Sequence, residues 1–264
     1  MDSYGVIGQP ISHSLSPSIH RRFAEQTHQQ LSYDALEVAP ADLASFVTDT
    51  ALAGFNVTLP HKQRVFDLLT DVSDRAAAAG AVNTVFRSED GRLSGDNTDG
   101  GGFIKDIDGH FSLAGQRVLL LGAGGAAQGI VTPVMDAGVS NLVIANRTYE
   151  KAKRLAEKSG ASALHWEELA SAEPFDGVIH STAAGHQQMP NLPICLVREG
   201  SWCYDLSYGS AARPFLAWGQ ARGCQVRDGL GMLVEQAALS FAIWRGVQPK
   251  TAPVLAELRA EGGG

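Results

Sequence analysis

The chain has 264 residues, of which 44% are hydrophobic and 19% are charged. This length allows one large or two ordinary domains, and the composition supports a packed core and argues against disorder. The net charge of −7 comes without a run of Lys and Arg, which argues against a surface that binds nucleic acid.

The three cysteines, Cys195, Cys203 and Cys224, match no metal-binding spacing, and we interpret them as small buried side chains in a reducing compartment. The N-terminus lacks a basic segment followed by an apolar one. No apolar run reaches the roughly 18 residues that a membrane span requires. We therefore expect a soluble, cytoplasmic protein.

Short apolar runs alternate with helical patterns along the chain, which predicts an α/β fold with mainly parallel strands. A first strand is expected at residues 4–7, before a helix with Ser16 as its N-cap and Pro17 at its first position. A second strand covers residues 54–58, and Pro60 opens the next helix.

The middle of the chain predicts a hairpin and then a change of domain. Residues 82–86 and 93–95 flank Asp90-Gly91, a turn signal typical of β-hairpins. The segment D-N-T-D-G-G-G at 96–102 is a glycine-rich hinge that leads into a short helix, where the first domain ends.

The second half begins with a strand at 117–121 that is too uniformly apolar for a surface position. A glycine turn, a helix to about Ala137 and a strand at 142–145 follow. Further strands are expected at 177–180 and 202–206, and an apolar helix follows Gly229-Leu-Gly231.

Residues 122–127 read G-A-G-G-A-A between a predicted strand and a predicted helix. This is the dinucleotide fingerprint G-x-G-x-x-A, in which glycines let the backbone turn and approach a pyrophosphate at the helix N-terminus. Glycine-rich turns also occur for packing reasons alone. The strand–turn–helix context favours a bound dinucleotide.

The next strand ends in Asn146, Arg147 and Thr148, and Lys151 and Arg154 follow on a helix. An NAD site usually has an acidic residue here for the ribose 2′-hydroxyl, whereas a guanidinium can bind the 2′-phosphate of NADP. A solvated basic helix face would give the same pattern. Because the acid is missing, we predict NADP.

Lys62 lies in the first turn of a predicted helix, where the dipole disfavours a cation and favours release of its proton. Transfer of a hydride between an alcohol and a ketone needs such a group at the oxygen, and Asp99 could hold the ammonium. An ordinary surface lysine is an equally good interpretation of the local pattern. The sequence does not establish that Lys62 and Asp99 meet.

Other polar residues stand at ends of predicted elements. Ser14 and Ser16 suit a small anion at a helix N-terminus, although a cap and a loop residue are the simpler interpretation. Hydrogen bonds to a polyol or turn formation would each explain Asn56, Thr58 and Asn83, and Gln236 interrupts an apolar helix. No metal site and no serine-hydrolase elbow is predicted.

These segments together resemble the shikimate dehydrogenase family, in family order over nearly the whole chain. The matching segments are G-Q-P-I-S-H-S-L-S-P-S-I-H (8–20), N-V-T-L-P-H-K (56–62), A-G-A-V-N-T-V (79–85), G-D-N-T-D-G (95–100), G-A-G-G-A (122–126), N-R-T (146–148) and D-G-L-G-M-L-V-E-Q-A (228–237).

The resemblance implies two α/β domains with a cleft between them: a substrate domain of residues 1–98 plus 229–264 and a Rossmann-type NADP domain of residues 99–228. It implies reversible, NADPH-linked reduction of 3-dehydroshikimate to shikimate on the route to chorismate and the aromatic amino acids. A quinate/shikimate dehydrogenase that uses NAD, and a non-catalytic NADP- or shikimate-binding regulator, stay open as alternatives. The implied protein is a monomer or a homodimer.

The resemblance also implies residue roles. Lys62 exchanges the proton at the substrate 3-oxygen, paired with Asp99, and Ser14 and Ser16 bind the carboxylate. The other implied substrate residues are Asn56, Thr58, Asn83, Tyr208 and Gln236. The implied cofactor residues are Gly122, Ala123, Gly124, Gly125, Ala126, Asn146, Arg147, Thr148, Lys151, Leu206 and Gly229.

Three departures from the family pattern stand out. Gln63 replaces a common Glu, His180-Ser181-Thr182-Ala183 replaces the usual N-A-T-S, and Arg213 stands where proline and threonine are common after Tyr208. The last two bear on the nicotinamide wall and on turnover, and not on the reaction class.

Overall fold

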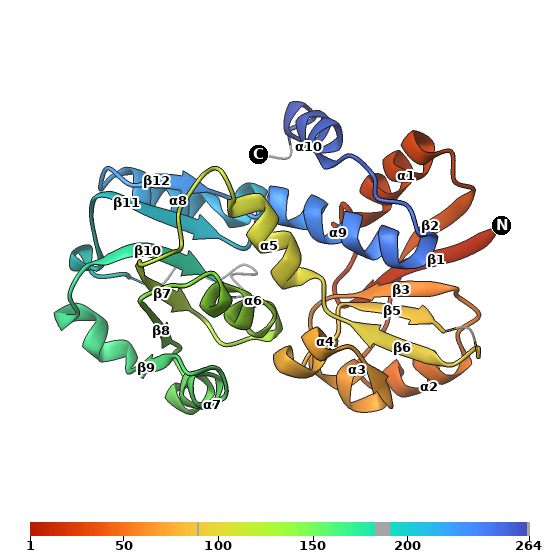
Figure 1. The fold of residues 1–264 in the computed structure, drawn as a ribbon, viewed down its shortest axis with the longest axis horizontal. Coiled ribbons are helices and arrows are strands. Elements are labelled where there is room, and N and C mark those ends of the chain that lie inside the picture. The colour runs from red at the N-terminus through yellow and green to blue at the C-terminus, as the bar shows by residue number, and fades with distance from the viewer. Residues whose placement is uncertain (89, 183–190, 263–264) are drawn as a thin grey trace. The chain divides into compact units, whose positions relative to one another are not determined.

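A computed structural model describes residues 1–88, 90–182 and 191–262. The chain divides into two compact units, Met1–Gly102 with Leu233–Glu257, and Phe103–Met232 with Leu258–Gly264. Each unit is built on a six-stranded sheet with helices packed against it, so the predicted α/β fold with two α/β domains is confirmed (Figure 1).

The first unit carries a mixed sheet with the strand order β2-β1-β3-β5-β6-β4. Strand β1 pairs in parallel with β2 and β3, whereas β5 is antiparallel to both β3 and β6. Its elements are β1 (Asp2–Gly8), α1 (Ser16–Thr27), β2 (Leu31–Glu37), α2 (Leu43–Asp49), β3 (Gly54–Val57), α3 (Lys62–Leu68), β4 (Asp71–Val72), α4 (Asp74–Ala79), β5 (Thr84–Arg87), β6 (Leu93–Asp96) and the start of α5 (Asp99–Ile107).

The predicted hairpin is confirmed, since β5 and β6 pair antiparallel and the turn between them contains Gly91 at φ +82°. The predicted cap of α1 is wrong. Leu15 is the N-cap, with helical angles of φ −82° and ψ −8°, and no side chain caps the helix. Because the backbone is already helical at Leu15, Ser16 is the first residue of α1 and not the residue before it.

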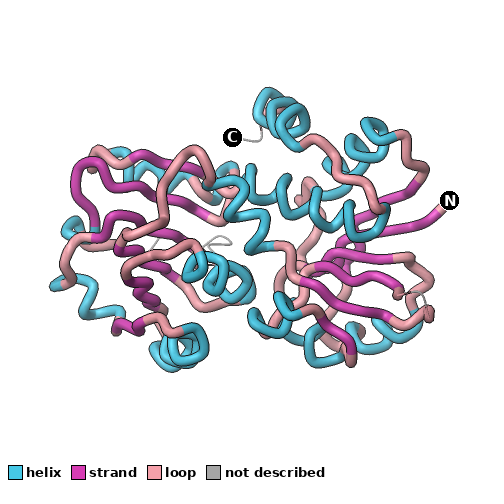
Figure 2. The backbone as a smooth tube through the Cα atoms, in the orientation of Figure 1, coloured by secondary structure: helices cyan, strands magenta, loops and turns pink. Residues whose placement is uncertain are grey.

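The second unit carries an all-parallel sheet with the order β12-β11-β10-β7-β8-β9. Figure 2 draws the strands of both units in magenta and the helices in cyan. Its elements are β7 (Arg117–Leu121), α6 (Gly125–Asp136), β8 (Asn141–Ala145), α7 (Tyr149–Ser159), β9 (Ser162–Leu164), η1 (Trp166–Ser171), β10 (Phe175–His180), η2 (Ile194–Leu196), β11 (Val197–Asp205), η3 (Gly209–Ala211), α8 (Arg213–Gln220) and β12 (Gln225–Arg227).

The order of this sheet reverses between β7 and β10, the central pair from which the strands run outward in both directions. In open parallel sheets, ligands bind outside the carboxyl ends of the strands at such a reversal point. The strand β7 is fully apolar from Val118 to Leu121, as expected for a strand with helices on both faces.

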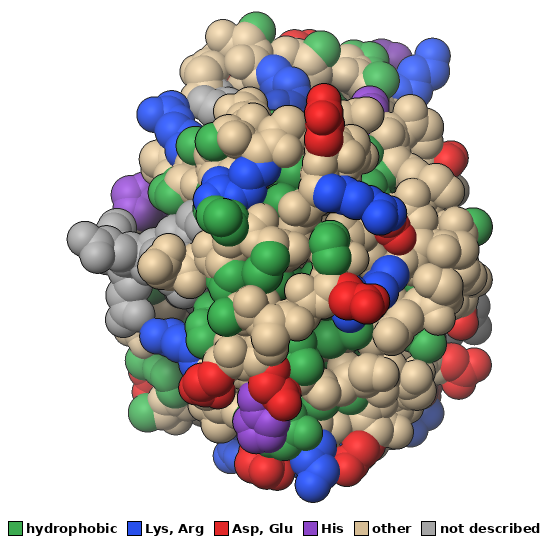
Figure 3. All heavy atoms as spheres, turned by 90° about the vertical axis from the view of Figure 1, so that its left-hand side faces the viewer, with side chains coloured by type: hydrophobic (Ala, Val, Ile, Leu, Met, Phe, Trp, Pro, Cys, Tyr) green, Lys and Arg blue, Asp and Glu red, His purple; other side chains and the backbone are tan. Residues whose placement is uncertain are grey.

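Two helices close the chain. Helix α9 (Leu230–Arg245) begins in the second unit and continues in the first, and α10 (Thr251–Ala260) follows it. Among the described residues, none of the helices is long and apolar enough to cross a membrane. On the face drawn in Figure 3, acidic and basic side chains are interspersed and form no large patch of one sign.

The core of the first unit contains a fully buried histidine, His20 on α1, stacked on Tyr33 with ring centroids 4.2 Å apart. Burial, only partly offset by the neighbouring Asn56 amide, lowers the pKa of His20 from 6.5 to about 3. In the unfolded chain His20 takes up a proton below pH 6.5, whereas in the folded chain it stays neutral. This histidine therefore costs stability as the pH falls from 6.5 toward 3.

We expect the stability difference between wild type and His20→Phe to depend on pH, because phenylalanine keeps the stacked ring and cannot titrate. Between pH 7.5 and 4.5 it should shift by about 3 kcal/mol in favour of the variant. Urea unfolding at both pH values measures the shift. A difference that does not change with pH would show that folding does not keep His20 neutral. The exposed His110→Gln variant is the control.

Candidate active site

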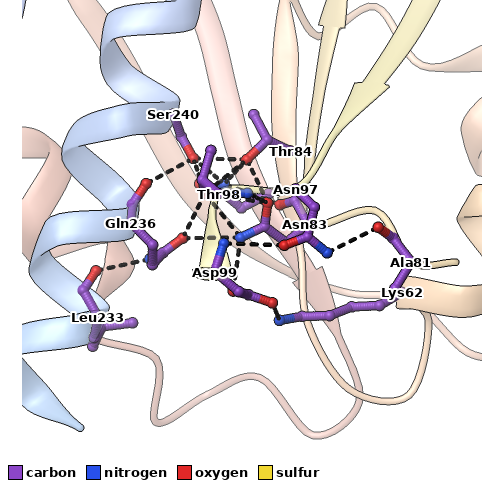
Figure 4. A network of polar contacts seen from close by, with 11 residues as sticks. Lys62, Ala81, Asn83, Thr84, Asn97, Thr98, Asp99, Leu233, Gln236 and Ser240 are labelled. Carbon is purple, nitrogen blue, oxygen red and sulfur yellow. Dashed lines mark hydrogen bonds and ion pairs between the residues drawn. The ribbon is translucent and has the colours of Figure 1, made fainter. Parts of the chain in front are cut away.

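The first unit brings Lys62 and Asp99 together, although 37 residues separate them in the sequence. Lys62 is the first residue of α3 and Asp99 the first residue of α5. The Lys62 Nζ donates to Asp99 Oδ2 at 2.5 Å, and the two side chains are only 12% and 6% exposed (Figure 4). Burial of an ion pair at this distance makes it far stronger than a solvated surface pair.

The carboxylate of Asp99 is held on both oxygens. While Oδ2 accepts from Lys62, Oδ1 accepts from Asn83 Nδ2 at 2.8 Å. The Asn83 side chain is buried, and its own oxygen accepts from the Thr98 backbone N–H at 2.8 Å. The carboxylate is therefore fixed in one orientation, with Lys62 presented at a defined point.

Asn97 is a further member of this network that the sequence interpretation missed. Its Oδ1 accepts from the Asp99 backbone N–H at 3.1 Å, and its Nδ2 donates to the Ala81 carbonyl at 2.9 Å. The signal was present, because an Asn two residues before a helical Asp commonly makes this local hydrogen bond to the backbone. Asn97 ties the start of α5 to the segment before β5.

The other side of the network comes from α9. The Gln236 Oε1 accepts from Asn83 Nδ2 at 3.3 Å, and its Nε2 donates to the Leu233 carbonyl at 2.8 Å (Figure 4). One turn later, the Ser240 hydroxyl lies 2.7 Å from the Thr84 hydroxyl. Gln236 thus satisfies its nitrogen on the backbone and directs its oxygen at Asn83.

Asn56, on β3, is bound entirely within the unit. Its Nδ2 donates to the Asn83 carbonyl and to the Ser240 hydroxyl, and its Oδ1 accepts from the Tyr33 hydroxyl at 2.8 Å. Such a fully paired buried amide fixes the neighbouring strands.

The topology of the mixed sheet explains why these residues converge. Strands β1 and β3 are parallel, so both end at the same edge. Strand β5 is antiparallel to β3, so it starts at that edge, and the pairing of Thr84 with Asp96 brings the end of β6 there too. The loops that carry Ser14, Thr58, Asn83 and Asp99 all leave from this edge.

The remaining predicted substrate residues belong to other segments of the chain. Ser14 Oγ accepts from the Ser16 backbone N–H at 3.3 Å, and Thr58 is half-buried just after β3. Tyr208 belongs to the second unit, where it is the N-cap of η3.

The glycine turn after β7 has the backbone that a dinucleotide site requires. Gly122 has φ +117°, and a Cβ atom there would lie 2.9 Å from the Ser181 carbonyl carbon. Gly124 is the N-cap of α6, and a Cβ atom there would meet none of the described residues within 4 Å. Gly125 and Ala126 form the first turn of α6, whose free N–H groups favour an anion. The chain thus makes a tight turn with open space at a helix N-terminus.

The segment after β8 is exposed and basic. Arg147 and Lys151 are exposed, and Asn146 Nδ2 donates to the Thr148 carbonyl at 2.9 Å, which shapes the turn into α7. No acidic residue occupies the strand end itself. This arrangement accommodates a phosphate on the ribose 2′-oxygen and gives a free 2′-hydroxyl no carboxylate partner there.

Leu206 and Gly229 are neighbours in the second unit. A Cβ atom at Gly229 would lie 2.3 Å from the Leu206 carbonyl oxygen, and the Gly229 N–H donates to the Ser207 carbonyl at 2.8 Å. Leu206 directly follows β11, and Gly229 lies between β12 and α9. Of the departures in the sequence, His180 ends β10, whereas Ala183 lies outside the described residues.

Three family models match the chain. The shikimate dehydrogenase substrate binding domain matches residues 6–85, the shikimate/quinate 5-dehydrogenase model matches residues 105–192, and the shikimate 5′-dehydrogenase C-terminal domain matches residues 229–259.

Similar proteins cover nearly the whole chain. The NADP(+) shikimate dehydrogenase of Halorhodospira halophila is 47% identical over 266 residues, covering 98% of each chain. Among solved structures, the Ael1 enzyme from Pseudomonas putida has a TM-score of 0.87 at 40% identity, covering 98% of each chain. Shikimate 5-dehydrogenase from Thermus thermophilus, in complex with NADP(H) and shikimate, has a TM-score of 0.87 at 33% identity, covering 98% of this chain and 99% of that one.

Proposed function

This chain belongs to the shikimate dehydrogenase family, and we propose that Lys62 and Asp99 are the catalytic pair with which it interconverts shikimate and 3-dehydroshikimate. The chain is an NADP-dependent oxidoreductase that acts on a CH–OH group, in the route to chorismate and the aromatic amino acids. The observation that carries the proposal for the pair is the buried contact of 2.5 Å between Lys62 Nζ and Asp99 Oδ2.

In the proposed mechanism, the Lys62 ammonium donates a proton to the 3-oxygen of 3-dehydroshikimate as that carbonyl is reduced. In the reverse direction, the neutral amine accepts the proton of the shikimate 3-hydroxyl. NADP supplies or accepts the hydride when bound. Asp99, fixed by Asn83, accepts a hydrogen bond from Lys62 and orients it. Proton transfer of this kind contributes about 10²–10⁴-fold to the rate, and orientation of the substrate contributes further.

For the substrate, we propose that Ser14 and Ser16 bind the carboxylate. The ring hydroxyls are bound by Asn56, Thr58, Asn83, Asp99 and Gln236, and Tyr208 is proposed to lie near the substrate. The proposal is supported by the common sheet edge from which most of these side chains come. Because Asn83 and Gln236 also bond to each other, we expect them to hold Asp99 in place as well as to bind substrate.

For NADP, we propose that Gly122, Ala123, Gly124, Gly125 and Ala126 hold the pyrophosphate, supported by the open space at Gly124 and the tight turn at Gly122. Asn146, Arg147, Thr148 and Lys151 take the adenosine 2′-phosphate, supported by the exposure and positive charge of Arg147 and Lys151. Leu206 and Gly229 line the nicotinamide.

We further propose that residues 1–98 plus 229–264 are the substrate-binding and catalytic domain and that residues 99–228 are the NADP domain. The division into compact units is similar up to Glu257, with changes of unit after Gly102 and after Met232, whereas Leu258–Gly264 is grouped with the second unit. The enzyme is proposed to act in the cytoplasm, as a monomer or a homodimer, without nucleic-acid or membrane partners.

The test is NADPH formation from shikimate by the purified chain. We expect kcat/KM with NADP and shikimate to exceed by at least about tenfold the values with NAD or with quinate, because Arg147 can pair with a 2′-phosphate and NAD has none. Strong preference for NAD or quinate would favour a quinate/shikimate dehydrogenase. Binding of both ligands without NADPH formation would establish a non-catalytic regulator.

The Arg147→Ala variant should affect KM for NADP and KM for NAD differently in the same assay. The variant should raise KM for NADP by roughly 10–100-fold, the loss expected for a charge-assisted hydrogen bond, and should leave KM for NAD nearly unchanged. Lys153→Ala, an exposed substitution on α7, is the control. Equal losses for both cofactors would remove Arg147 from the 2′-phosphate site.

A further inference from the structure

A chain of three side chains joins the ends of β10 and β11 in the second unit. His180, the last residue of β10, places its Nδ1 at 2.9 Å from Oδ2 of Asp205, the last residue of β11. The His180 Nε2 lies 2.5 Å from the Thr182 hydroxyl. The His180 and Asp205 side chains are 2% and 0% exposed, so the pair is shielded from water.

The hydrogen bonds define the role of each atom. A carboxylate only accepts, so His180 Nδ1 carries a proton toward Asp205, whose other oxygen accepts from the Ser207 backbone N–H at 2.8 Å. The Thr182 hydroxyl is then the hydrogen-bond partner of the other ring nitrogen, Nε2. The ring also stacks on Phe215, with centroids 4.8 Å apart. His180 is thus held on its face and at both nitrogens, which leaves it one orientation.

This chain of contacts lies where the strand order reverses. The Ser181 backbone N–H donates to the Leu121 carbonyl at 2.8 Å, and the Ser181 carbonyl carbon is the atom that a Cβ at Gly122 would strike. The Leu206 N–H donates to the His180 carbonyl at 2.8 Å. Through its own backbone and its neighbours, His180 therefore connects the Gly122 turn with the Leu206 segment.

We propose that His180 is a positioning residue for the nicotinamide half of NADP, acting through Thr182 and Asp205 on the segments that contact the cofactor. The proposal rests on the NADP site proposed above. In a sheet of this order, the strands on either side of the reversal each hold one mononucleotide half. Arg147 follows β8 on the adenosine side, whereas His180 and Asp205 end β10 and β11 on the other side.

Thr182 is held in position by this contact. Thr182 is the last described residue before the gap at 183–190, and its hydroxyl bonds to a group rigidly fixed by Asp205 and Phe215. Loss of the hydroxyl releases Thr182 while the His180–Asp205 pair stays intact. If that pair has only a structural role, the variant should keep its affinity for NADP. If His180 positions the cofactor through Thr182, the variant should bind NADP more weakly.

The experiment is a double-mutant cycle with Thr182→Val and His180→Asn, measured by calorimetry with NADP and with adenosine 2′,5′-bisphosphate, which lacks the nicotinamide half. Asparagine can still donate to Asp205 but cannot reach Thr182. Thr182→Ser restores the hydroxyl, and the exposed His110→Asn is the matched control. KM for shikimate and thermal unfolding are measured alongside.

We expect Thr182→Val to weaken NADP binding about tenfold, the effect of one lost buried hydrogen bond, and to leave adenosine 2′,5′-bisphosphate binding and KM for shikimate unchanged. Thr182→Ser should bind like wild type, and Thr182→Val should add nothing in the His180→Asn background. If Thr182→Val does not fold, His180→Asn alone must show the same selective loss.

Unchanged NADP affinity in Thr182→Val would overturn the proposal, as would equal weakening of both ligands or additive effects in the double variant. Failure of the wild-type chain to bind NADP would instead reject the NADP site itself. If the wild-type chain binds NADP and forms NADPH, and Thr182→Val and His180→Asn bind NADP with unchanged affinity, only the positioning role is rejected.

Discussion

Replacing Lys62 with alanine is expected to lower kcat for shikimate oxidation by about 10²–10⁴-fold and to leave shikimate binding largely intact. The variant removes the group that exchanges the proton at the 3-oxygen, whereas the proposed carboxylate and hydroxyl contacts stay in place. Steady-state kinetics give kcat, and calorimetric titration with shikimate gives the dissociation constant.

Lys62→Arg sharpens this result, because a guanidinium keeps the positive charge beside Asp99 and does not release its proton near neutral pH. A comparable fall of kcat in both variants identifies proton transfer as the lost function. Recovery of activity in Lys62→Arg would point to charge alone. If shikimate binding vanished while the residual kcat did not fall, Lys62 would be a binding residue.

Replacing Gly122 with alanine is expected to raise KM for NADP by about 100-fold or more. The residue has φ +117°, which a side chain disfavours, and the added Cβ would lie 2.9 and 3.0 Å from the carbonyl carbon and oxygen of Ser181. The backbone must shift, and the helix N-terminus that receives the pyrophosphate shifts with it. KM for NADP and calorimetric binding of NADP measure the loss, and shikimate affinity should not change.

Gly138→Ala is the matched control for backbone strain. Gly138 has φ +81° in the same unit, and within the part of the chain that the structure describes a Cβ atom there would meet nothing within 4 Å. Both variants carry the cost of a positive φ, of order 1 kcal/mol, and only Gly122→Ala carries the collision with Ser181. Equal NADP affinity in the two variants would show that the turn at Gly122 does not set cofactor binding.

The cofactor half of the site could be predicted from the sequence because its signals are local. The turn at Gly122 and the basic segment at Arg147 each lie within a few residues of the strand that positions them. The strand predictions at 117–121 and 142–145 agree with β7 and β8 to within a residue. The parallel sheet then follows from the alternation of strand and helix.

The substrate half is non-local. Lys62 and Asp99 meet only because β5 and β6 turn back along β3, and residue patterns around either position do not carry that pairing. Ser240 was missed because it acts through contacts with other elements, whereas the local hydrogen bond of Asn97 to the Asp99 N–H left a signal in the sequence. The prediction that Ser16 is the N-cap of α1 was wrong. The helix begins one residue earlier than expected because the backbone of Leu15 already has helical angles, and residue types alone do not reveal those angles.

The reversed hairpin of the mixed sheet has one more consequence. In a wholly parallel sheet each strand offers only its carboxyl end to a ligand, so polar groups must be gathered from distant parts of the chain. Here β5 offers its beginning and β6 its end, and Asn83, Asn97 and Asp99 come from a single short stretch of sequence. The three groups that orient Lys62 therefore lie on one continuous segment of the chain. Recombination or protein design could transfer that segment as a unit between related proteins.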